Sequence, residues 1–109
     1  MIIVKPRSKD EFRKIVEEAR KSSRLVYISA HPCPECKAFE LALRALGVDT
    51  SRIVKIDVPS EDWAVEYVVE ELGVAGAPSV LLPDGGVLDD VDPLELARKV
   101  KKYLEKNAV

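Results

Sequence analysis

The spacing of apolar residues predicts a helix near the start of the chain and a buried strand after it. Ser8 and Glu11 form a capping box, and apolar residues then recur at helical spacing up to about Lys21. Residues 1–4 are a candidate leading strand. Residues 25–28 form an apolar run that is rich in β-forming residues and too short for a helix, which predicts a buried central strand.

The middle of the chain predicts a helix, a strand and a further helix. Pro34 suits the first position of a helix, and apolar residues continue at helical spacing to Gly47, where a helix would end. Residues 53–58 are typical of a second buried strand. Ser60 is then expected to cap a third helix, which ends at Gly73.

The last third of the chain predicts a hairpin followed by a helix. Residues 79–82 form a third strand, and the Pro-Asp-Gly-Gly sequence at residues 83–86 favours a tight turn into residues 87–88. Asp92 and Pro93 begin a final helix. The order is βαβαβαββα, in which helical crossovers imply parallel strands and the turn implies an antiparallel pair. We expect an α/β fold with a central mixed β-sheet flanked by helices, in a single domain over residues 1–109.

Composition and charge narrow the class of protein. With 109 residues and 47% hydrophobic residues, the chain is long enough to bury a core without staples. Its 17 Lys and Arg against 19 Asp and Glu lack the cationic excess that nucleic-acid binding requires. No apolar run is long enough to cross a membrane, and the start does not resemble a signal peptide. We expect a cytoplasmic protein whose partners include neither nucleic acid nor a membrane.

The scarcity of amide side chains indicates a thermophilic source. The chain has no Gln, its one Asn is Asn107, and 33% of its residues are charged. Amides are thermolabile, and charged groups cost less to desolvate at high temperature. Intracellular disulfides are tolerated in such organisms, so a disulfide in this chain would not imply secretion.

The strongest candidates for reactive residues are the two cysteines of the chain, Cys33 and Cys36, which form one Cys-x-x-Cys motif. Two thiols at this spacing on the first turn of a helix can close a small disulfide ring. Free backbone N–H groups and the helix dipole favour a thiolate at Cys33, which we expect to be the more exposed sulfur. Cys36 lies one turn further in and would be the resolving thiol. Beside a βαβ pattern, this sequence is typical of a redox motif.

Other uses of the two cysteines stay open from the sequence. A zinc ion usually needs four ligands, and the chain offers two cysteines and His31 beside its carboxylates. A zinc ion or an iron–sulfur cluster shared across a dimer, in a binding or assembly module, is a second alternative. A purely structural disulfide is a third, although so short a loop constrains the unfolded chain little.

Two segments resemble the thioredoxin-like superfamily. The sequence VYISAHPCPECK at residues 26–37 resembles the strand, active-site loop and helix start of that superfamily, and its Cys-Pro-x-Cys form is similar to glutaredoxins. Residues 54–58 (VKIDV) and 73–82 (GVAGAPSVLL) resemble the family's central strand and its cis-proline loop. Together with the order of elements, the resemblance covers nearly the whole chain.

The resemblance implies a fold, an activity and partners. It implies the thioredoxin fold and a thiol:disulfide oxidoreductase that needs no metal or organic cofactor. Its substrates would be protein disulfides or dithiols, its partner would be a reductase or another thiol donor, and it would be a monomer or weak dimer. The family's cis-peptide maps onto Ala77 and Pro78, which with Pro32 are the predicted substrate contacts. Pairing with a substrate strand at this loop would be an example of strand addition.

Departures from the family pattern concern the groups around the thiols. The buried acid that thioredoxins carry in the central strand aligns with Tyr27, so the usual proton acceptor for Cys36 is missing. Three neighbouring side chains are expected to shift the pKa of Cys33, and they do not all shift it in the same direction. A protonated His31 or Lys37 would favour the thiolate, and Glu35 would oppose it.

Overall fold

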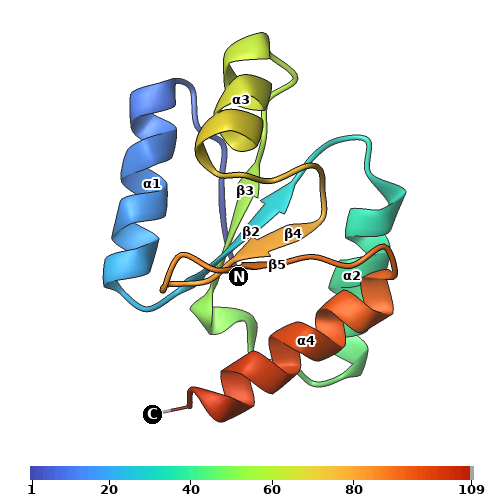
Figure 1. Ribbon diagram of the computed structural model, residues 1–109. Helices are drawn as coiled ribbons and strands as arrows, with labels where there is room; N and C mark the ends of the chain where they lie inside the picture. The colour runs from blue at the N-terminus through green and yellow to red at the C-terminus, as the bar shows by residue number, and fades with distance from the viewer. Residues whose placement is uncertain (109) are drawn as a thin grey trace.

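A computed structural model describes residues 1–108, in which a five-stranded mixed sheet lies between two pairs of helices (Figure 1). The predicted α/β class and the order of strands and helices are confirmed. The strands are β1 (Ile2–Val4), β2 (Leu25–Ser29), β3 (Ile53–Asp57), β4 (Ser79–Leu81) and β5 (Val87–Leu88). The helices are α1 (Lys9–Lys21), α2 (Pro34–Ala45), α3 (Asp62–Glu66) and α4 (Pro93–Lys106), with a 3₁₀ turn η1 (Thr50–Arg52) and a π-helical segment η2 (Tyr67–Glu71).

The sheet order is β1-β3-β2-β4-β5, which puts β2 at the centre. Strands β1, β3 and β2 are parallel, as the helical crossovers predict, and β4 and β5 are antiparallel to their neighbours. Tyr27 in the middle of β2 pairs with Lys55 of β3 on one side and with Val80 of β4 on the other. The carboxyl end of β2 therefore leads from the middle of the sheet into the loop that carries Cys33.

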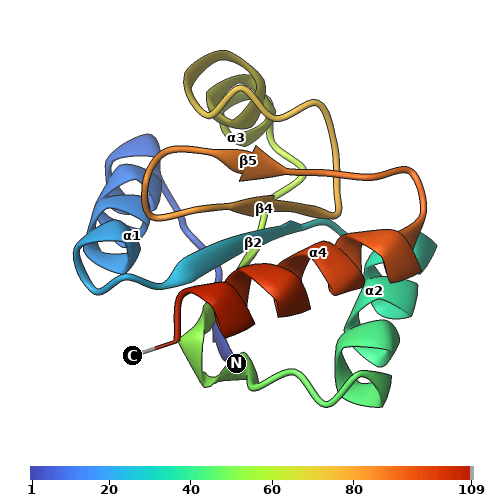
Figure 2. The ribbon, with the colours of Figure 1, turned by 60° about the horizontal axis from the view of Figure 1, so that its bottom comes forward.

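The two faces of the sheet carry separate cores. Helices α2 and α4 pack on one face and α1 and α3 on the opposite face, as Figure 2 shows by turning the molecule. The alternation of side chains along β2 divides the strand, so that Tyr27 joins the α2 and α4 core while Ile28 joins the α1 and α3 core. All five residues of β2 are buried, which agrees with its continuous apolar run.

Two predicted helix caps are present. The Ser8 side chain accepts a hydrogen bond from the backbone N–H of Glu11 at 3.1 Å, and α1 begins at Lys9, directly after Ser8. The Asp92 carboxylate accepts from the N–H of Leu94 at 3.0 Å at the start of α4. Each bond satisfies an N–H group that the helix itself leaves without a partner.

The prediction for the third helix is wrong in two respects. Ser60 does not cap it, because the N-cap is Glu61, which makes no side-chain capping bond. The Glu61 carboxylate accepts a hydrogen bond from the Trp63 indole N–H instead. The helix also changes to π-helical geometry at Tyr67, which is buried with its ring centroid 4.7 Å from that of Phe12.

An ion-pair network ties α1 to η2 and has a predictable pH dependence. Lys9 Nζ and Arg13 Nη2 lie 3.0 Å and 3.1 Å from the Glu71 carboxylate. Hydrogen bonding from Lys9, followed by Arg13, lowers the pKa of Glu71. A lowered folded-state pKa means that the stabilisation is present above the unfolded pKa and is lost as the pH falls through the folded one.

Glu71→Gln is therefore expected to lower the thermal midpoint at pH 7 by a few degrees at most, because exposed ion pairs stabilise weakly. At about pH 2, where the carboxyl group is protonated in both folded and unfolded chains, the variant and the parent should unfold at the same temperature. Thermal unfolding followed by circular dichroism at both pH values is the measurement. A destabilisation of equal size at both would contradict the assignment.

Candidate active site

The two cysteines lie at the start of α2 and form a disulfide. Cys33 is the N-cap residue and Pro34 occupies the first turn, as the sequence predicts. The backbone N–H of Cys36 donates to Sγ of Cys33 over 3.1 Å. Cys33 therefore takes the capping role that a Ser or Asp side chain usually has, and its sulfur faces the positive end of the helix dipole.

The two sulfur-bearing residues differ in exposure. Cys33 is 8% exposed and Cys36 is 2% exposed, so Cys33 is the residue that solvent or a partner reaches more readily. This agrees with the order expected from the sequence. The structure contains the oxidised state of the pair, and no other cysteine is present in the sequence.

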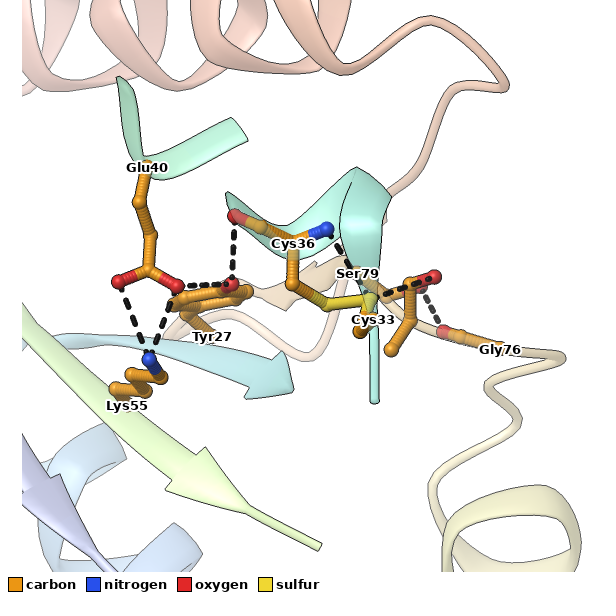
Figure 3. Close-up of a disulfide and its surroundings, with 8 residues drawn as sticks. Tyr27, Cys33, Cys36, Glu40, Lys55, Gly76 and Ser79 are labelled. Carbon is orange, nitrogen blue, oxygen red and sulfur yellow. Dashed lines mark hydrogen bonds and ion pairs between the residues drawn. A yellow bond between two sulfur atoms is a disulfide. The ribbon is translucent and has the colours of Figure 1, made fainter. Parts of the chain in front are cut away.

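The loop before β4 lies directly against the disulfide. Sγ of Cys33 is 3.9 Å from the carbonyl oxygen of Ala77, and the Ala77–Pro78 peptide bond is cis. The Ser79 hydroxyl donates to the carbonyl oxygen of Gly76 over 2.7 Å and holds the loop closed (Figure 3). Ala77 is half-buried and Pro78 is buried. Of these two predicted contact residues, Ala77 is thus the one with accessible surface.

The remaining predicted site residues are distributed around the disulfide. Pro32 is exposed next to Cys33, and its peptide bond with His31 is also cis, which the sequence analysis did not anticipate. His31 and Lys37 are exposed and line a cavity of about 510 Å³ together with both cysteines. Glu35 is exposed and lines a separate groove with Ala77. His31 and Lys37 therefore border one hollow beside the disulfide, and Glu35 borders another.

A polar network that the sequence analysis missed lies beneath Cys36. Lys55 Nζ is 2.9 Å and 3.1 Å from the two carboxylate oxygens of Glu40, and the Tyr27 hydroxyl lies 3.0 Å from Oε2 of the same carboxylate. The Tyr27 hydroxyl is also 3.3 Å from the carbonyl oxygen of Cys36. Burial, with a smaller contribution from the nearby Glu40 charge, raises the pKa of Tyr27 above its ordinary value. The hydroxyl therefore keeps its proton.

Two features of the sequence could have indicated this network. Lys55 is the one charged side chain inside the otherwise apolar run of residues 53–56, and a partly buried cation needs a partner. Glu40 lies four residues after Cys36 and so projects from the same face of the helix. What joins the two is the pairing of β2 with β3 under α2, which cannot be read from local spacing.

Two other properties bear on the candidate functions. Among residues 1–108, no three His, Cys, Asp or Glu side chains gather closely enough to hold a metal ion. None of the helices in this range is both long and apolar enough to cross a membrane.

A Cys-x-x-C disulfide at the start of a helix, beside a proline loop at the centre of a mixed sheet, defines the class of thiol:disulfide exchange proteins. The chain belongs to the thioredoxin family, because the family model for thioredoxin matches residues 3–106. No curated protein matches the chain.

Solved structures of low sequence identity share the fold. Oxidised thioredoxin O2 from Arabidopsis thaliana superposes with a TM-score of 0.67 at 19% identity, covering 98% of this chain and 95% of that one. The oxidised C-terminal domain of Neisseria meningitidis DsbD gives 0.63 at 20% identity, covering 98% and 99%. A poplar thioredoxin h gives 0.62 at 20% identity, covering 96% and 98%. The superfamily expected from the sequence is confirmed.

Proposed function

We propose that the protein exchanges protein disulfides through Cys33 as the nucleophile and Cys36 as the resolving thiol. The observation that carries the proposal is the position of Cys33, an N-cap residue that is more exposed than Cys36 and whose sulfur accepts a hydrogen bond from a backbone N–H. The helix terminus stabilises negative charge on this sulfur, and the thiolate is the form that attacks disulfides.

The reaction has two steps, attack on the substrate by Cys33 and resolution by Cys36. The Cys33 thiolate attacks one sulfur of the substrate disulfide, so that a bond from Cys33 to substrate forms as the substrate S–S bond breaks, and the released thiolate takes up a proton. Cys36 then loses its proton and attacks Sγ of Cys33, which releases the second substrate sulfur as a thiol. The substrate gains two electrons and the Cys33–Cys36 disulfide forms. A reductase or another thiol donor returns the pair to the dithiol, and the reverse sequence oxidises a dithiol substrate.

Substrate binding is assigned to the surface beside Cys33. The Ala77 carbonyl, 3.9 Å from Sγ of Cys33, would pair with an extended substrate segment, and Pro32 and Pro78, next to Cys33 and Ala77 in the sequence, would contact that segment. Protein disulfides are favoured over glutathione mixed disulfides, because Gly76 and Ala77 stand where glutaredoxins have Thr-Val before the cis-proline. A protonated His31 and Lys37 favour the Cys33 thiolate, whereas Glu35 opposes it.

The direct test is turnover of a protein disulfide. Catalytic amounts of the protein should accelerate the reduction of insulin by dithiothreitol severalfold, and protein whose thiols have been alkylated should not. If the intact protein gave the same rate as the alkylated one, the proposal would be wrong.

The alternative predicted from the sequence, a thioredoxin-fold assembly module whose cysteines hold a metal or cluster across a dimer, has its own test. Metal analysis of protein purified under reducing conditions would favour it by finding zinc or iron at half-stoichiometry.

A further inference from the structure

The second step of the proposed exchange needs an acceptor for the Cys36 proton. An ordinary cysteine thiol has a pKa of about 8.5, so only a few per cent of it is thiolate at pH 7. Cys36 is 2% exposed and lies inside the first turn of α2, away from bulk water. The position in β2 that faces it carries Tyr27, which keeps its proton. The acceptor of the Cys36 proton must therefore be a residue outside β2.

Glu40 is the carboxylate that the fold brings to this position. It projects from α2 one turn after Cys36, and its side chain is 29% exposed, with Lys55 at 16%. Figure 3 shows the Tyr27 hydroxyl between the Glu40 carboxylate and the carbonyl oxygen of Cys36, and Lys55 in contact with both carboxylate oxygens. The Lys55 ammonium, 2.9 Å and 3.1 Å from the two carboxylate oxygens, compensates part of the cost of burying this side chain.

The same network can hold an added proton. The Tyr27 hydroxyl has one hydrogen and two acceptors in reach, Glu40 Oε2 at 3.0 Å and the Cys36 carbonyl at 3.3 Å. When Glu40 is ionised, Tyr27 donates to it. When Glu40 is protonated, it can donate to the Tyr27 oxygen while the tyrosine hydrogen turns to the Cys36 carbonyl, so no polar atom of the set loses its partner. Such an arrangement suits a group that gains and loses a proton during a reaction.

A cavity connects the thiol and the carboxylate. Cys36 and Glu40 both line the cavity of about 510 Å³ that opens beside the disulfide, which is large enough for several water molecules. The other charged and titratable side chains that face this cavity come from the elements around it: Lys5 after β1, His31 in the loop before α2, Lys37 on α2, and Lys55 and Asp57 on β3. Basic side chains outnumber acidic ones around this cavity.

We infer that Glu40, held by Lys55 and Tyr27, accepts the proton of Cys36 through water in this cavity when Cys36 attacks the mixed disulfide. This inference rests on the proposed function, since it assigns a role in its second step. The proton passes from Cys36 Sγ to the Glu40 carboxylate, and Glu40 later returns it to solvent through the same cavity. Asp57 is the competing carboxylate, because it lines the same cavity from β3 without the contacts to Lys55 and Tyr27.

Stopped-flow reaction of the reduced protein with 5,5′-dithiobis(2-nitrobenzoate) separates the two steps. The first thionitrobenzoate is released when Cys33 attacks the reagent, and the second when Cys36 attacks Sγ of Cys33. At pH 7, Glu40→Gln should slow the second release at least about tenfold, since losing a general base usually costs about 10²- to 10⁴-fold, and should leave the first release unchanged within about twofold. Asp57→Asn is the matched control and should leave both phases within about twofold of the parent.

The outcomes of this experiment distinguish a failure of the role of Glu40 from a failure of the proposed function. A second phase that Glu40→Gln leaves unchanged, or that Asp57→Asn slows instead, overturns the role of Glu40 and leaves the two-cysteine reaction standing. Absence of any second release in the parent overturns the proposed function itself.

A second variant guards against misfolding of Glu40→Gln. Lys55→Met removes the cation that favours the ionised carboxylate, so the pH at which the second phase reaches half its maximal rate should move upward relative to the parent. Circular dichroism verifies that each variant is folded. A pH profile that coincides with that of the parent would contradict the inference, because it would mean that Lys55 does not influence the group that accepts the Cys36 proton.

Discussion

Cys33→Ser is expected to reduce the rate of disulfide exchange on the order of 10³-fold, to that of the uncatalysed reaction, because a serine hydroxyl does not ionise near neutral pH. The variant should still fold, since Ser is itself a preferred N-cap residue and can accept the Cys36 N–H that Cys33 accepts now. Initial rates of insulin reduction at matched concentrations measure the effect. Retention of more than a small fraction of the parent rate would show that Cys33 is not the nucleophile.

Cys36→Ser should behave differently from Cys33→Ser, because it removes only the second step. The variant is expected to attack a substrate disulfide once and remain joined to it through Cys33. Non-reducing gel electrophoresis and mass spectrometry should detect this mixed disulfide, which dithiothreitol would release. If Cys36→Ser turned over a protein disulfide as rapidly as the parent does, the two-cysteine mechanism would be wrong.

Phe39→Ala is expected to cost about 3–5 kcal/mol of unfolding free energy, a large share of the total for a domain of this size. Phe39 is fully buried in the core beneath α2, and its ring meets that of Tyr27 edge-on with centroids 4.9 Å apart. Truncation leaves a cavity next to the hydroxyl that contacts Cys36 and Glu40. Urea unfolding at equilibrium measures the change.

Leu41→Ala is the control for the Phe39 variant. Leu41 lies on the same helix but is 60% exposed, so its truncation should change the unfolding free energy by no more than about 0.5 kcal/mol. Equal effects at the two positions would mean that α2 does not pack on the sheet as described.

The fold could be predicted where local pattern and tertiary packing agree. The continuous apolar run of β2 predicts a strand buried on both faces, and the helical spacing of apolar residues in α1 predicts its single buried face. The segment after Ser60 departs from this rule, because burial of Tyr67 against Phe12 and the bond from Trp63 to Glu61 involve contacts that helical periodicity does not contain. Sequence spacing could indicate a helix there but not its π-helical second half.

The candidate site was predictable only where its geometry is local. The position of Cys33 follows from Pro34 and the helix that Pro34 begins, all within a few residues. The carboxylate beneath Cys36 could not be found in the same way, because Glu40 and Lys55 are 15 residues apart and meet only through the packing of α2 on the sheet. The resemblance to the family implies that Tyr27 stands where other members carry an acid, but it does not indicate which element supplies another one.

The reduction potential of the Cys33–Cys36 pair tests the central claim most directly. Equilibration in graded redox buffers, followed by alkylation of free thiols and mass spectrometry, gives the fraction of disulfide at each potential. A value between about −270 and −120 mV, the range of known exchange proteins, is the expected result. A value well below about −300 mV would identify a structural disulfide and contradict the assignment of an exchanging pair.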